Sequence, residues 1–228
     1  MKQKQRKLVR QLAAFDVLSD VLGTLGLRSR LFCRSELVAP WAMAFPAGNL
    51  AHFHIIERGG AWVELEGSKS PFALAPGDVI VVSRGIPYRL VDQPGNRELQ
   101  PIEFPHPDPS GRHILLRQGR GGATSVLICG SFSFEQAEDH PALALLPKVM
   151  HLRGGVSPAG TWLDFMSRFL IAEASSMSPG TVTVLSRLTD ILFVQVLRAW
   201  LAEESVQPSW LSGLNDPRVA PALTLIHE

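Results

Sequence analysis

His52-Phe53-His54 decides the fold, together with Pro76-Gly77-Asp78 and Gly85-Ile86-Pro87-Tyr88 further along the chain. Strand side chains alternate between two faces, so histidines two residues apart point both imidazoles to one side of a sheet. The Pro-Gly-Asp turn leads into the apolar run Val79-Ile80-Val81-Val82, which predicts a second hairpin over the same space. The pattern therefore predicts a small β-barrel with a polar or metal site inside it.

The composition is that of a folded protein with little net charge. The chain has 228 residues, of which 46% are hydrophobic and 19% charged, and its net charge is +1. This length is enough for one generous domain with a helical appendage. The near-neutral charge argues against strong DNA binding by this chain alone.

The number of cysteines and the hydropathy of the chain indicate the cellular compartment of the protein. Two cysteines give no disulfide framework and fit a reducing cytoplasm. No apolar run approaches the roughly 20 residues needed to span a bilayer. The sequence therefore predicts a cytoplasmic protein with no membrane partner.

Short apolar runs broken by Gly, Pro, Asn and Asp extend from residue 28 to about residue 134. Such runs with regular turn signals are typical of a barrel or sandwich. A proline-rich stretch over residues 93–111 predicts a long irregular loop. The predicted strands cover residues 30–37, 41–45, 51–57, 61–66, 78–82, 88–91, 113–117 and 124–134.

The apolar period becomes helical after about residue 140. Leu146, Val149 and Met150 form one short helical face, and the run around Trp162 predicts a longer helix. Ser178-Pro179 has the pattern of an N-cap followed by proline, which predicts a second helix to about residue 202. Two helices joined by a short turn should pack as an antiparallel hairpin, giving an α+β fold.

The ordered series of motifs resembles the AraC/XylS-type transcriptional regulators that have a cupin-like N-terminal sensor domain. The resemblance runs from Asp16 to nearly the end of the chain. The residues that carry it are Asp16-Val17-Leu18-Ser19-Asp20-Val21-Leu22, His52-Phe53-His54, Pro76-Gly77-Asp78, Arg84-Gly85-Ile86-Pro87, Leu127-Ile128-Cys129-Gly130, His140-Pro141, Leu145-Leu146-Pro147, Arg187-Leu188-Thr189-Asp190, Gln195-Val196-Leu197-Arg198-Ala199-Trp200 and Asp216-Pro217-Arg218.

The resemblance implies a cupin-like β-barrel of the jelly-roll type followed by the helical hairpin. Residues 1–15 are then a basic, disordered tail, and residues 16–140 the sensor barrel. Residues 141–203 form the hairpin for dimerisation and coupling. Residues 204–228 are a linker and the first helix of a missing DNA-binding module, opened by Asp216-Pro217-Arg218. We expect a homodimer that binds DNA only through that module, which would contain the recognition helices.

His52 and His54 are also candidate metal ligands. In a catalytic cupin site a third histidine comes from the second motif, but here that position resembles Tyr88, and Glu57 points to the opposite strand face. The ligand set of an oxygenase or isomerase is therefore broken. A zinc site from His52, His54, Cys129 and His140 stays open, against a pair of hydrogen-bonded pocket histidines and a core cysteine.

The leading hypothesis is a receptor for a small-molecule effector of unknown identity. His52, His54, Trp62 and Tyr88 are the predicted effector contacts, although barrel aromatics usually only fill a core. The alternative is a small metal-dependent cupin enzyme with a degenerate ligand set. A third possibility is a stand-alone cupin that dimerises without an effector.

Overall fold

The computed structural model describes residues 26–68, 70–95, 114–135, 146–154, 160–176 and 178–203. The chain divides into two compact units, and the larger one contains residues 28–133 and 147–197. The contacts discussed below all lie within this larger unit. The predicted first helix of the DNA-binding module, after Asp216, lies outside the described residues, as does most of the predicted loop over residues 93–111.

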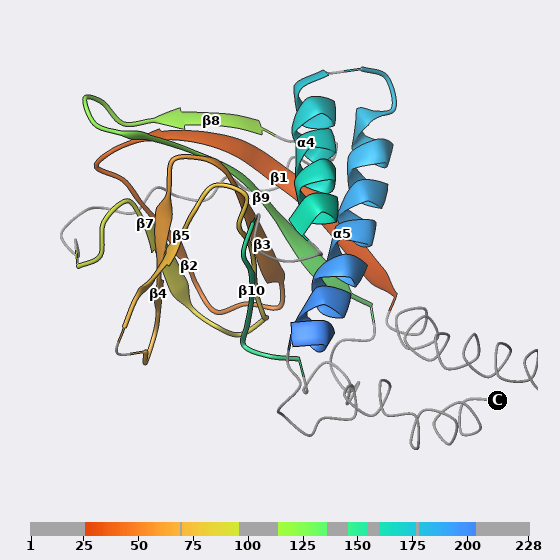
Figure 1. The fold of residues 1–228 in the computed structure, drawn as a ribbon, viewed down its shortest axis with the longest axis horizontal. Coiled ribbons are helices and arrows are strands. Elements are labelled where there is room, and N and C mark those ends of the chain that lie inside the picture. Colours follow the sequence, from red (N-terminus) through yellow and green to blue (C-terminus); the bar gives the residue numbers. More distant parts are fainter. Residues whose placement is uncertain are drawn as a thin grey trace, which may run out of the picture. The chain divides into compact units, whose positions relative to one another are not determined.

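The described part of the chain is mostly β-sheet with two helices (Figure 1). The strands form a six-stranded sheet of order β10-β6-β3-β9-β1-β8 and a four-stranded sheet of order β2-β7-β4-β5. The bounds are β1 (Leu27–Val38), β2 (Ala42–Phe45), β3 (Ala51–Arg58), β4 (Ala61–Leu65), β5 (Phe72–Leu74), β6 (Val79–Val82), β7 (Tyr88–Val91), β8 (Ile114–Gln118), β9 (Thr124–Phe134), β10 (Val149–Leu152), α4 (Gly160–Ser176) and α5 (Thr181–Glu203).

The main core lies between the two sheets. In the four-stranded sheet the backbone pairing aligns Met43, Leu90, Val63 and Phe72, and these side chains share one face. The core cluster joins them to residues of the six-stranded sheet such as Ile80. The alternation of buried and less buried positions thus follows from the period-two geometry of strands.

The prediction of a closed barrel is not confirmed. The described strands form two separate sheets, which is consistent with a cupin-like β-sandwich. Strand β8 pairs in parallel with β1 at one edge of the larger sheet, and β10 pairs antiparallel with β6 at the other.

The two helices form the predicted hairpin and lie side by side along the six-stranded sheet (Figure 1). Phe193 of α5 packs on Phe132 of β9, with ring centroids 4.8 Å apart. The Ser29 hydroxyl of β1 lies 2.6 Å from Oδ1 of Asp190 on α5. Each sheet face therefore has a different partner: the helices cover one face of the larger sheet, and the smaller sheet covers the other.

The eight predicted strands are confirmed with small shifts at their ends, but two further strands were missed. Strand β10 falls where the period of Leu146, Val149 and Met150 predicted a helical face, and this prediction is wrong. The backbone there pairs with β6 instead, which satisfies its hydrogen bonds within the sheet. The predicted N-cap at Ser178 is also wrong, because Gly180, with φ of 87°, precedes the first residue of α5.

Candidate effector site

Strand β3 places His52 and His54 on the inner face of the six-stranded sheet. Backbone pairing sets His54 opposite Ile80 of β6 and opposite Cys129 of β9. Both of these neighbours belong to the core between the sheets, and paired residues point to the same face. His52, two residues earlier, shares this direction. The prediction that both imidazoles point to one face is therefore confirmed.

His54 is the centre of a buried chain of hydrogen bonds. Its Nε2 atom lies 2.6 Å from the hydroxyl oxygen of Tyr88 on β7, and its Nδ1 atom lies 3.2 Å from Sγ of Cys129. A neutral imidazole has one N–H donor and one acceptor nitrogen, so two arrangements satisfy all three groups. In one, Tyr88 donates to Nε2 and Nδ1–H donates to the sulfur. In the other, the thiol donates to Nδ1 and Nε2–H donates to the Tyr88 oxygen.

The chain continues through a second thiol. Cys33 lies on β1, the strand next to β9, and hydrogen bonding with Cys129 lowers the pKa of its thiol. Its Sγ atom is also 3.2 Å from the hydroxyl oxygen of Ser35. Polar groups therefore connect β7 to β1 through the inside of the sandwich, and all of these side chains are buried.

The site is polar but uncharged near neutral pH. Burial lowers the pKa of His52 to about 4. Burial and then the neighbouring His52 hold the pKa of His54 well below its usual value. Burial, and to a lesser degree Cys129, raises the pKa of Tyr88 well above its usual value. Each shift favours the neutral form, because a low-dielectric interior disfavours charge.

Phe45 of β2 holds the rings of the site in position. Its ring stacks on that of Tyr88, with centroids 4.6 Å apart and planes 5° from parallel. The same ring lies 4.9 Å from His54 and 5.3 Å from His52. Aromatic contacts of this kind add a preferred ring orientation to the hydrogen bonds.

Two residues considered from sequence lie elsewhere. Trp62 pairs with Val91 and Ala73 on the outer face of the smaller sheet, because its neighbour Val63 points into the core. It is therefore not brought together with His54. Glu57 receives two hydrogen bonds from the Arg34 guanidinium, at 2.6 and 2.7 Å, and this ion pair occupies both carboxylate oxygens.

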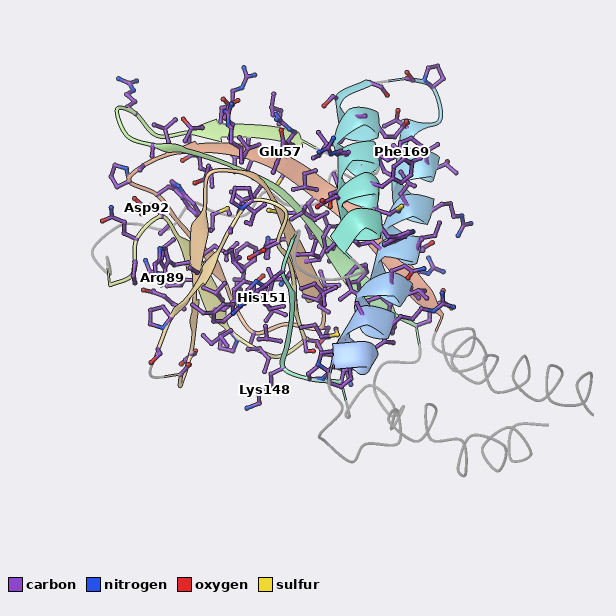
Figure 2. The ribbon with its side chains drawn as sticks, in the orientation of Figure 1. Glu57, Arg89, Asp92, Lys148, His151 and Phe169 are labelled. Atoms are coloured by element: carbon purple, nitrogen blue, oxygen red, sulfur yellow. The ribbon has the colours of Figure 1, made fainter. Side chains whose placement is uncertain are left out.

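Sequence reasoning missed Cys33 and His151. The period-two series Cys33, Ser35, Leu37 on a predicted strand was the available signal for the first. His151 lies on β10 opposite Ile80, hence on the same face as His54, and its ring is 5.6 Å from Phe72 of the smaller sheet (Figure 2). Here the helical interpretation of the segment hid the alternation.

His151 belongs to a cluster around Asp78. One carboxylate oxygen of Asp78 lies 2.9 Å from Nε2 of His151 and accepts the amide of Ala75 at 3.0 Å. The other oxygen accepts the amide of Gly154 at 2.9 Å. A Cβ atom on Gly154 would lie 2.7 Å from the carbonyl carbon of Gly77, so the two backbones meet too closely for a side chain. The Pro-Gly-Asp turn is thus tied to β10.

The described residues alone do not form a metal site. Among the described residues, no group of three or more His, Cys, Asp or Glu side chains is placed to hold a metal. Both nitrogens of His54 are already engaged by Tyr88 and Cys129. His140, the fourth predicted ligand, lies outside the described residues. His54 and Cys129 by themselves form a hydrogen bond.

Comparison with known proteins places the chain in a family. The sequence profile of the cupins matches residues 16–202. An AraC-like transcription regulator of Streptomyces lividans is 30% identical over 213 residues, which are 93% of this chain and 68% of that protein. The chain belongs to the AraC-like transcription regulators with a cupin domain. An AraC-like regulator of Streptomyces antibioticus is 29% identical and covers 93% of the chain and 69% of its own length.

More distant proteins also match over most of the chain. The regulator AlkR of Acinetobacter baylyi is 24% identical, covering 93% of this chain and 70% of its own. Among solved structures, ToxT of Vibrio cholerae has a TM-score of 0.35 at 7% identity and covers 88% of this chain and 74% of its own. The AraC-like activator CuxR has a TM-score of 0.33 at 12% identity, with 78% and 61% coverage. None of the described helices is long and apolar enough to cross a membrane.

Proposed function

We propose that this chain is the effector-sensing and dimerisation region of an AraC-like transcription regulator, which contacts DNA through a further helix-turn-helix module. The named relatives support a regulator, and they extend beyond the match, since it covers 68% and 69% of two of them. A small-molecule effector enters the sandwich interior and meets His52, His54 and Tyr88.

The observation that carries this proposal is the polar chain through an otherwise apolar core. Fully buried polar groups destabilise a fold unless they are hydrogen-bonded, so an ordinary core avoids them. Here Tyr88, His54 and Cys129 occupy interior positions where Leu or Val would fill the space. A few fixed polar groups among aromatic side chains are typical of sites that recognise small ligands.

The neutral state of the site bears on the effector. His52, His54 and Tyr88 are uncharged near neutral pH because of the pKa shifts described above. An apolar or aromatic effector with a hydrogen-bonding group suits such a site, since Phe45 offers a ring face beside it. Trp62 lies on the outer face and is left out of the proposed contacts.

A second copy of the chain is the proposed partner of the helices. Phe165 and Phe169 of α4 are 65% and 44% exposed and contact each other, with ring centroids 6.4 Å apart. Ile191 of α5 is 45% exposed. Large apolar side chains in such numbers on one helical pair are more typical of an interface than of a solvated surface.

Signalling then requires that the effector bind two arrangements of the dimer with different affinity. Strand β10 offers the covalent route, because the chain passes from His151 in the interior to the start of α4 at Gly160.

The proposal is tested by thermal-shift screening of the purified chain with a library of apolar and aromatic small molecules. A ligand present at about 100 times its Kd should stabilise the fold by about 2.7 kcal/mol. The same ligand should lose most of this effect on Tyr88→Phe, which removes the hydroxyl, and keep it on the matched outer-face variant Trp62→Phe. A ligand that stabilises Tyr88→Phe and the wild type equally would place the effector elsewhere.

A further inference from the structure

Two polar atoms are buried without a partner at one end of the smaller sheet. They are Nε1 of Trp41, just before β2, and Oδ1 of Asp92, just after β7 (Figure 2), and neither has a hydrogen-bond partner among the described residues. Trp41 is 2% exposed and belongs to the core cluster. Buried polar atoms are nearly always hydrogen-bonded, because one without a partner has lost its bonds to water without replacement. A buried donor and a buried acceptor at one place therefore point to a bound group that supplies both partners.

The strand pairing brings these two residues together. β2 and β7 are antiparallel, with Ala42 opposite Val91, so Trp41 and Asp92 are the next pair of the ladder. The amide of Asp92 donates to the carbonyl oxygen of Trp41 at 3.2 Å, which extends the pairing to this position. Side chains of such an opposed pair lie on one face, with their Cβ atoms about 5 Å apart. The free donor of Trp41 and the free acceptor of Asp92 are therefore neighbours that do not bond to each other.

This pair lies where the core meets the solvent. The residue before Trp41 and the residue after Asp92 are both exposed, and Asp92 itself is partly exposed. A ligand at this pair therefore needs no passage through the packed centre of the sandwich. Phe45, beside the proposed effector contacts, is four positions from Trp41, which is about 13 Å at the rise of a β-strand. The two places are thus distinct ends of one strand pair.

We propose that Trp41 and Asp92 form a subsite for an uncharged hydroxyl group of a small ligand; that this ligand is the effector rests on the proposed function. A hydroxyl both accepts and donates, so its oxygen takes the indole N–H and its hydrogen goes to Oδ1 of Asp92. A ligand carboxylate has no hydrogen for Asp92, and the two negative charges repel each other. An ammonium group leaves the indole N–H unpaired. The subsite therefore selects an alcohol or phenol over an acid or amine of the same size.

Titration of the folded chain with benzyl alcohol, toluene and benzoate tests the subsite by NMR. The chain has five tryptophans, and in ¹⁵N-tryptophan-labelled protein Trp41→Phe identifies the indole signal of Trp41. Sequential assignment of the wild type serves if this variant fails to fold. Benzyl alcohol should shift the signal saturably and bind about tenfold more tightly than toluene or benzoate. Equal affinity for toluene would overturn the proposal, as would an unmoved Trp41 signal, which is the result expected if water alone fills the subsite.

Asp92→Asn tests the selection against acids. The asparagine amide keeps an acceptor for the hydroxyl, adds a donor and removes the charge, so benzoate should gain about tenfold in affinity. Glu66→Gln makes the same change of charge at an exposed position and should leave benzoate binding as it is in the wild type. An equal gain in both variants would reduce the effect to net charge and refute the role of Asp92.

Tyr88→Phe separates this inference from the proposed function. The Tyr88 hydroxyl belongs to the effector contacts at the other end of the strand pair, so its removal should leave the binding of benzyl alcohol at Trp41 unchanged. A loss of the Trp41 shift in this variant would place the alcohol at Tyr88 and overturn the subsite. An unchanged shift supports the subsite even where screening finds no effector for the contacts around Tyr88.

Discussion

The two faces of the six-stranded sheet are built from the same strands but held in different ways. On the helix side, Phe53 of β3 packs on Phe132 of β9 with ring centroids 5.0 Å apart, and Phe193 of α5 packs on Phe132. On the inner side, His54 and Cys129 of the same two strands face each other through a hydrogen bond. Apolar area holds both faces, and the inner face adds matched donors and acceptors to it.

Because of this difference, apolar packing can stabilise the fold while the hydrogen-bonding groups are available to recognise a ligand. Apolar burial has no direction and tolerates a ligand poorly, since a close-packed core has no spare space. Hydrogen-bonding groups can exchange one partner for another at a smaller net change in free energy. In the proposed sensor, the helices stay attached to one face of the sheet while the other face responds. Four measurements test this comparison.

The largest effect is expected on the helix side. Phe132→Ala should lower the free energy of unfolding by about 3–5 kcal/mol, because it removes a fully buried ring from two aromatic contacts. Urea denaturation followed by tryptophan fluorescence measures this change. The control is Phe169→Ala, whose ring is 44% exposed. Equal losses for the two variants would mean that the helices are not held by this face.

A smaller effect is expected from Tyr88→Phe on the inner face. The change leaves Nε2 of His54 without its partner and should reduce the free energy of unfolding by about 1–3 kcal/mol. The loss should shrink when Tyr88→Phe is added to His54→Leu, because the orphaned group is then absent. Urea denaturation of the four proteins of this cycle gives the coupling. Strict additivity would contradict the hydrogen bond.

The pH dependence isolates His52. Its pKa is about 4 in the folded chain, below the usual value of about 6.5 in an unfolded chain. The unfolded state therefore binds more protons than the folded state as the pH falls below about 6.5, and the free energy of unfolding decreases between about pH 6.5 and about pH 4. For this partly exposed ring we expect a decrease of about 1 kcal/mol at about pH 5. Denaturation at several pH values should show a shallower loss in His52→Gln. A parallel pH profile in the two proteins would refute the assignment.

The smallest effect on folding is expected at the exposed helix surface. Phe165→Asp should change the free energy of unfolding of the monomer by no more than about 0.5 kcal/mol, because the ring is 65% exposed. It should nevertheless weaken the proposed dimer, which sedimentation at several concentrations measures. Leu115→Asp, at an exposed site of β8, is the matched control. Loss of association in both variants would point to an interface other than the helices.

Most of the fold could be predicted because strand alternation and helical period are local properties of the sequence. Eight strands and the helical hairpin follow from them. Strand β10 was misread because a short apolar run fits either period, and only its pairing with β6 decides the outcome. Trp62 illustrates the limit for the site: the sequence shows that it alternates with Val63, but which of the two faces the core depends on the second sheet.

Only the part of the candidate site that lies on one strand could be predicted from the sequence. His52 and His54 share a strand, so their common direction is local. The link from His54 to Tyr88 joins the two sheets, and the link from Cys129 to Cys33 joins strands that are distant in sequence. Such partners are set by tertiary packing, which no short motif contains.

The cluster around Asp78 also limits which substitutions this part of the chain can accept during evolution. The carboxylate holds His151 and the amide of Gly154, while a side chain at 154 would meet the backbone of Gly77. These positions are therefore not independent sites for mutation. In descendants of this gene, a side chain at 154 would push away the turn that presents the carboxylate. We expect the four residues to be inherited or replaced as a unit.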